Sequence, residues 1–210
     1  YVISRYSGNV ENADADNDLF REEVQIPLLM SSILMDIGIC HPDAILILKG
    51  ESRLKDEFRN LDNDDRISLL KICYQQSIQY ITKGLGTEKY VGNSKTEREA
   101  WDKNEQKKLK FALILLKQSV KPEQGIGNVL KIPQIYTSVV MSTKSSYSYE
   151  SLPKALSLLN KGAENGKHSQ VVVNALSKIT GIFPQGFGIV YMPLGELAGQ
   201  GDCYEYAIVN

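Results

Sequence analysis

Few side chains in this 210-residue sequence could carry out catalysis or hold a metal ion. The chain has two histidines, His41 and His168, and three cysteines, none of them in a C-x-x-C pair. Asp36 is the most suggestive acid, because it ends the apolar run Ile33-Leu34-Met35. An isolated carboxylate in such a place can bind one hard cation weakly, or it can accept hydrogen bonds from backbone N–H groups or a nearby base. We expect the structural role for Asp36, since the sequence offers it no partner ligands.

Other catalytic groupings are missing from the sequence. His41 precedes Pro42 and His168 lies in a turn before the last expected helix, so we expect hydrogen-bonded cap or surface histidines rather than metal ligands. Cys73 is expected in mid-helix, near Lys71 but remote from both histidines, and we interpret it as a small core residue rather than a nucleophile. The sequence contains no G-x-S-x-G elbow, no Walker loop and no H-E-x-x-H pair.

One stretch of the chain resembles a known metal-site motif. Ile33-Leu34-Met35-Asp36-Ile37-Gly38 resembles the Leu-His-Asp-Ile-Gly-Lys signature of HD-GYP phosphodiesterases, the bacterial hydrolases of cyclic di-GMP. Pro42-Asp43-Ala44-Ile45-Leu46 is similar to the family's Pro-Asp-x-Ile-Leu run, and the likeness continues in the same order from about Met30 to Val209. Met35, however, stands where the family has a metal-binding histidine, and a thioether cannot replace an imidazole on iron, manganese or zinc at a hydrolytic centre. The resemblance therefore implies the fold of the family without its reaction.

The same resemblance places four residues at a vestigial site. Asp36 would remain from the His-Asp pair, and Cys73 falls where a His-Pro segment usually lies. Gln118 falls near the paired histidines of the family, and Thr137 takes the place of a metal-binding aspartate within Lys131–Val140. If these correspondences are right, the four residues converge in one cleft. Phosphodiester hydrolysis in the family depends on two or three bridged metal ions. Because the residues at the corresponding positions of this chain cannot hold such ions, we predict no catalytic residue, no metal ligand and no cofactor. Residues that bind any other ligand are not identified.

Helical periodicity accounts for most of the chain. The apolar spacing predicts helices at about 20–37, 42–49, 62–84, 97–120, 132–142, 151–161 and 169–180. Two β-prone runs, 186–192 and 204–209, are separated by Gly, Pro and Asp and should pair as a hairpin. We expect a mainly α fold, an HD-domain-like helical bundle with a small C-terminal β-hairpin, divided into a helical domain of residues 1–182 and a short β extension of residues 183–210 packed on it.

Composition limits the partners and the location. The net charge is -1, with 24 basic and 25 acidic residues, which removes the broad positive field of a nucleic-acid binder. Lysines 103, 107, 108 and 110 near Trp101 are therefore expected to form a solvated helix face. Three widely spaced cysteines favour a reducing, cytoplasmic location, and no apolar run approaches the roughly 18 residues of a membrane helix. The opening Tyr1-Val2-Ile3 indicates a piece of a longer protein.

Three functional hypotheses follow, all in the bacterial cyclic di-GMP context that the resemblance implies. The preferred one is a catalytically inactive HD-GYP-like regulatory or scaffolding module that binds a regulatory protein or forms a homodimer. The second is a sensor that binds cyclic di-GMP without cleaving it, which is weakened by the lack of arginine where guanine and phosphate would be recognised. The third is an active phosphodiesterase with a reorganised metal site. The related HDOD group of regulatory modules is an alternative assignment for the fold.

Overall fold

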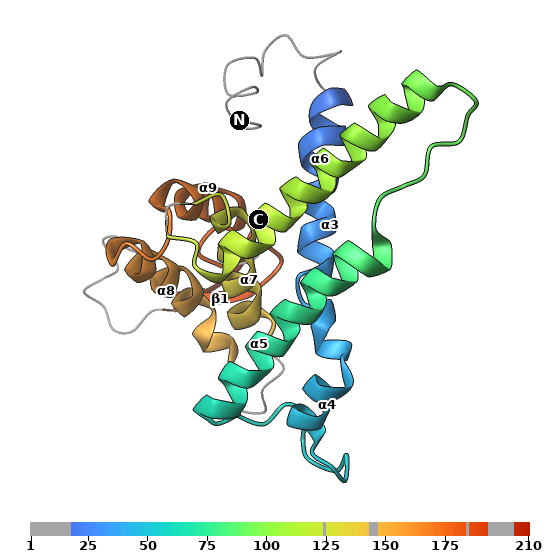
Figure 1. The fold of residues 1–210 in the computed structure, drawn as a ribbon. Helices are drawn as coiled ribbons and strands as arrows, with labels where there is room; N and C mark the ends of the chain where they lie inside the picture. Colours follow the sequence, from blue (N-terminus) through green and yellow to red (C-terminus); the bar gives the residue numbers. More distant parts are fainter. Residues whose placement is uncertain (1–17, 124, 143–146, 184, 193–203) are drawn as a thin grey trace.

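The computed structural model describes residues 18–123, 125–142, 147–183, 185–192 and 204–210 (Figure 1). These residues form a mainly helical fold with one two-stranded antiparallel sheet, which confirms the predicted fold class. The α-helices are α3 (Ile26–Leu34), α4 (Pro42–Lys49), α5 (Asn63–Gln79), α6 (Lys95–Val120), α7 (Asn128–Val140), α8 (Leu152–Glu164) and α9 (Gln170–Thr180). The π-helices η1 (Arg21–Gln25) and η3 (Tyr80–Leu85) and the 3₁₀-helices η2 (Ile37–Cys40) and η4 (Tyr149–Ser151) adjoin them.

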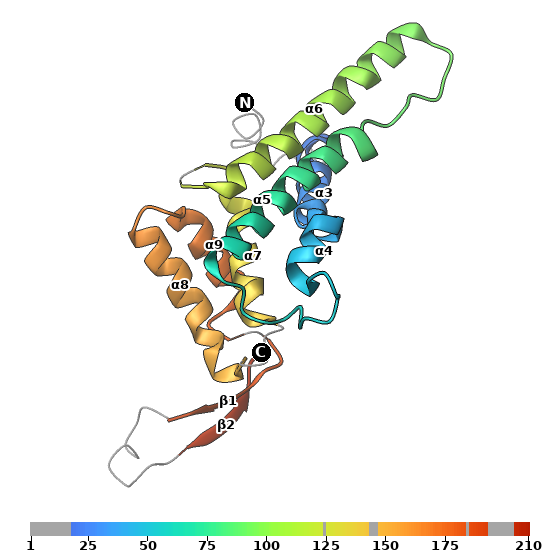
Figure 2. The same ribbon diagram turned by 60° about the horizontal axis from the view of Figure 1, so that its bottom comes forward.

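The helices form two groups that share α7. In the first group α3, α5 and α6 lie side by side, with α4 beyond the end of α3 (Figures 1 and 2). The apolar core of this group, to which η3 and α7 also contribute, consists of Ile81, Phe111, Leu115, Leu116 and Leu130. The second group, α7, α8 and α9, encloses Ile132, Tyr136, Ala155, Leu156, Leu159 and Val173. Because α7 contributes to both cores, it fixes the two groups relative to each other.

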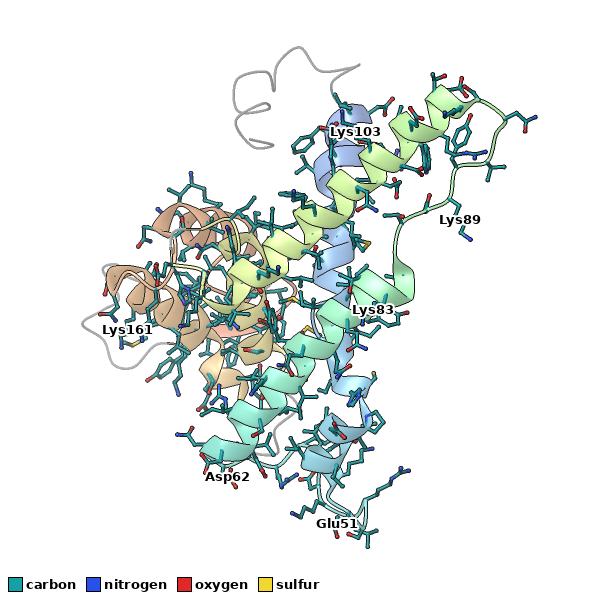
Figure 3. All side chains as sticks on the ribbon, viewed as in Figure 1. Glu51, Asp62, Lys83, Lys89, Lys103 and Lys161 are labelled. Atoms are coloured by element: carbon teal, nitrogen blue, oxygen red, sulfur yellow. The ribbon has the colours of Figure 1, made fainter. Side chains whose placement is uncertain are left out.

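The long helix α6 starts with mostly charged residues and ends with mostly apolar ones, and its second half is the more buried. Lys103 lies on the first half of α6 (Figure 3). Lys108, one of the lysines expected on a solvated face, instead binds carboxylates within the chain, since its Nζ lies 2.7 Å from an oxygen of Glu22 and 3.1 Å from one of Glu105. From Phe111 onward the helix enters the core.

The sheet is a hairpin of β1 (Gly188–Tyr191) and β2 (Glu205–Ile208) that extends away from the helices (Figure 2). The strands pair in the register Gly188↔Ile208 to Tyr191↔Glu205. Its base contacts the bundle where the ring of Phe187 lies 5.9 Å from that of Tyr149. The predicted hairpin is therefore present, while Pro184 and residues 193–203 of the predicted β extension lie outside the described residues.

The first helical stretch has an unusual surface. Asp18–Cys40 is long and apolar enough to cross a membrane by length and composition, a test that the core helix of a soluble protein also passes. Within it, α3 packs one side on α6, burying Ser31 completely. The opposite side leaves Ile26, Leu29 and Ile33 exposed. The expectation of no membrane insertion stays a prediction.

Candidate functional site

A cleft of about 370 Å³ lies where the end of α3, the middle of α5, the end of α6 and the start of α7 meet. We call it the Asp36 cleft. Its walls are formed by Met35, Asp36, Leu70, Lys71, Cys73, Tyr74, Ser77, Ile78, Leu116, Ser119, Val120, Lys131 and Gln134. Two of the four predicted site residues, Asp36 and Cys73, are therefore brought together from different helices.

A close junction between η2 and α5 holds Asp36 beside Cys73. A Cβ atom on Gly38 would collide with the backbone of Cys73, so only glycine allows η2 to approach α5 this closely. The hydroxyl of Ser77, which is buried on α5, fastens the junction. It accepts a hydrogen bond from the N–H of Gly38 (3.0 Å) and donates one to the carbonyl of Met35 (3.0 Å). The backbone on both sides of Asp36 is thus fixed to α5.

The carboxylate of Asp36 is bound by an amide. Nε2 of Gln134 donates to both carboxylate oxygens, at 3.0 and 3.2 Å. Oε1 of the same side chain accepts from Nζ of Lys131 at 3.1 Å. Burial lowers the pKa of Lys131, which the negative charge of Asp36 partly opposes. Hydrogen bonds therefore connect the ammonium of Lys131, the amide of Gln134 and the carboxylate of Asp36.

The surroundings of Cys73 reduce the reactivity of its thiol. Burial raises its pKa, and the negative charge of Asp36 raises it further. Because the thiolate is the reactive form, these surroundings disfavour nucleophilic attack by Cys73 at neutral pH.

The other two predicted residues lie next to the cleft but not on its walls. Gln118 is exposed, and its Oε1 accepts a hydrogen bond from the N–H of Ile126 at 3.1 Å, while its neighbour Ser119 lines the cleft. Thr137 is also exposed, and its hydroxyl donates to the carbonyl of Pro133 at 3.0 Å. The cleft position on α7 is taken by Gln134, one turn before Thr137.

The two histidines have different roles. His41 is the N-cap of α4, where Nδ1 accepts a hydrogen bond from the N–H of Asp43 at 3.3 Å, and this confirms the predicted cap. His168 packs against Gly162, and its Nδ1 is buried with no hydrogen-bond partner among the described residues. The expected hydrogen-bonded role of His168 is therefore not confirmed. Burial lowers the pKa of His168, and the ammonium of Lys131 lowers it further.

Sequence reasoning missed Lys131 and Gln134, although both lie within the run compared with the family. Their spacing of three residues places them on one helical face, and that spacing was the available signal. Within the described part of the chain, no group of three or more His, Cys, Asp or Glu side chains could hold a metal ion.

Comparison with known proteins adds no assignment. No protein-family model, no curated protein and no solved structure matches this chain.

Proposed function

We propose that this chain is a catalytically inactive, HD-GYP-like module of bacterial cyclic di-GMP signalling that regulates or scaffolds other proteins by direct contact. The observation that carries the proposal is the state of Asp36, the one acidic residue that the resemblance retains at the site. Both of its carboxylate oxygens accept hydrogen bonds from Gln134, an uncharged amide.

The chemistry of the cleft supports the absence of hydrolysis. A metal-dependent phosphodiesterase needs divalent ions that lower the pKa of a bound water and stabilise charge developing on the phosphate. Among the described residues, no group of three or more His, Cys, Asp or Glu side chains could hold such ions. The ammonium of Lys131, which Gln134 links to Asp36, can attract an anion but cannot coordinate water and make hydroxide from it. The cleft therefore favours a structural or binding role over turnover.

The outer side of α3 supports contact with another protein. Ile26, Leu29 and Ile33 lie at helical positions i, i+3 and i+7, and they are 38%, 60% and 76% exposed. Together they form an apolar stripe, and exposed apolar patches commonly mark interaction surfaces. We call these three residues the α3 stripe. A second copy of the chain or a regulatory protein would cover it.

A turnover assay tests the inactivity. The purified protein is incubated with cyclic di-GMP and added Mn²⁺ or Fe²⁺, beside the variant Asp36→Ala. We expect no linear or monomeric nucleotide product from either protein. Turnover by the natural protein that is lost in Asp36→Ala would overturn the proposal.

Analytical ultracentrifugation tests the contact surface. Self-association through the α3 stripe predicts a weight-average mass that rises with protein concentration, and Leu29→Glu with Ile33→Glu should abolish that rise. The matched control, Leu54→Glu with Val91→Glu, introduces the same charge at residues that are 86% and 95% exposed elsewhere, and it should leave the association unchanged. A natural protein that stays monomeric at every concentration would contradict the homodimer.

A further inference from the structure

The Asp36 cleft combines apolar walls with one charged corner. Met35, Ile78 and Leu116 contribute apolar side chains from three different helical segments. Lys131 and Asp36 supply charge at the start of α7 and the end of α3. A cleft of about 370 Å³ is at the small end of the range of roughly 300–1,000 Å³ for small-molecule sites, so it suits a compact ligand rather than a dinucleotide.

The ammonium of Lys131 is only partly satisfied by the protein. An ammonium carries three N–H donors, and among the described residues its one hydrogen bond goes to Oε1 of Gln134. Both oxygens of Asp36 are already bound by Nε2 of the same glutamine. Lys131 is also half-buried, and a charged donor withdrawn from water requires further acceptors. Two donors of Lys131 are thus available to an acceptor that enters the cleft.

The charge around Lys131 favours an anionic acceptor. Asp36 is the negative group that acts on Lys131, whereas Arg66 acts on it as a second positive charge. The exposed Lys71 is another basic residue on the cleft wall. Burial and the positive charge of Lys131 lower the pKa of His168, which favours its neutral form. The thiol of Cys73 is held in its protonated form. Positive charge is therefore in excess at this corner.

We propose that the Asp36 cleft binds a small organic carboxylate, with its carboxylate on the ammonium of Lys131 and its apolar body against Met35, Ile78 and Leu116. The apolar walls distinguish this ligand from inorganic phosphate, which would leave them uncovered. Such a ligand would touch α3, α5, α6 and α7 at once, and its binding would stabilise the junction of these helices. This site goes beyond the proposed function and does not depend on it.

Binding of hexanoate to the full chain tests the proposal, with hexanamide, acetate and inorganic phosphate as comparison ligands. Calorimetry should show saturable binding of hexanoate near one molecule per chain, and a melting temperature that rises with ligand concentration. Hexanamide lacks the charge, while acetate and phosphate lack the apolar body, so each should bind at least about tenfold more weakly. Equal binding of hexanamide and hexanoate would overturn the proposal, and so would no binding of hexanoate.

Two further measurements locate the site. Lys131→Met removes the charge but keeps an apolar stem, and it should weaken hexanoate binding at least about tenfold. Lys117→Met, an exposed residue on α6, should not change it. In the natural protein, NMR signals of the Met35 methyl group should shift with hexanoate, whereas those of Met141, which is 75% exposed at the end of α7, should not. Undiminished binding in a folded Lys131→Met variant, or an unshifted Met35, would contradict the site.

Discussion

Asp36, Gln134 and Lys131 form a hydrogen-bonded network that holds the carboxylate of Asp36 in place. The amide of Gln134 joins two groups of opposite charge, donating to Asp36 and accepting from Lys131. Hydrogen bonds to charged groups are stronger than those between neutral groups. The three side chains therefore tie the end of α3 to the start of α7, which gives Asp36 a structural role.

Replacing Gln134 with alanine tests this role. The variant loses the hydrogen bonds to Asp36 and Lys131, and we expect the free energy of unfolding to fall by about 1–2 kcal/mol, since Asp36 is exposed enough to be partly rehydrated. Urea denaturation measures the change. Thr137→Ala, one turn further along α7, removes a hydroxyl that bonds only its own helix and should change stability by less than about 0.5 kcal/mol. Equal effects of the two variants would contradict the account.

His168 gives the molecule a pH dependence with a defined sign. Burial, and then the charge of Lys131, lower the pKa of its imidazole in the folded chain, whereas the unfolded chain has the ordinary value of about 6.5. As the pH falls below about 6.5, the unfolded chain takes up a proton that the folded chain resists, so the free energy of unfolding decreases. The contribution of His168 to the free energy of unfolding is fully present above about pH 6.5, and it is lost as the pH falls through the lowered pKa of the folded chain.

Denaturation at pH 5 and pH 7 measures the effect. His168→Gln should reduce the difference in stability between the two pH values, whereas His41→Asn, which keeps a good N-cap residue on α4, should preserve it. If His168→Gln retains the full difference, the pH dependence arises elsewhere.

At the scale of elements, the junction between η2 and α5 positions the cleft. Gly38→Ala would push a methyl group into the backbone of Cys73, and the two segments would have to separate. We expect a loss of about 2–4 kcal/mol in the free energy of unfolding. Gly188→Ala is the matched control, because no atom lies within 4 Å of the added Cβ on that exposed strand residue. Thermal and urea denaturation would compare them, and a stable Gly38→Ala variant would show that the junction is looser than described.

Local sequence signals predicted most of the elements. Asp62 caps α5, accepting a hydrogen bond from the N–H of Asp65 at 2.8 Å, and Pro153 lies in the first turn of α8, as their residue types indicate. The start of α7 was predicted at residue 132 but lies at Asn128. This difference is tertiary in origin, since Oδ1 of the fully buried Asn128 accepts from the N–H of Ser169, which is 41 residues away.

The site was predictable only in part, for a related reason. The resemblance identified Asp36 and Cys73, which share the cleft wall. Asp36 lies in a run that resembles the family's signature, whereas Cys73 was placed only by its order along the chain. The choice of Gln134 over Thr137 as the cleft residue on α7 depends on the rotation and axial position of that helix against α3, and no local pattern encodes these. A difference of one helical turn, about 5.4 Å, decides which side chain reaches Asp36.

At the scale of the whole molecule, the two helical cores hold the fold without the hairpin. Neither core includes a residue from β1 or β2. A chain that ends at Ile182 should therefore unfold cooperatively, with a loss of about 2 kcal/mol or less. A chain that ends at Gly166 should not fold, because it lacks Val173, which is fully buried in the second core. Circular dichroism during heating distinguishes these outcomes, and an unfolded Ile182 chain would contradict the division at residue 182.

The central proposal is that a hydrogen-bonded lysine, glutamine and aspartate occupy the position at which an HD-GYP phosphodiesterase holds its metal ions. Mass spectrometric metal analysis tests it most directly, using the full chain purified with Mn²⁺ and Fe²⁺ under reducing, anaerobic conditions and then desalted. We predict far less than one ion per chain, with no difference between the natural protein and Asp36→Ala. About two ions per chain that disappear in Asp36→Ala would contradict the account.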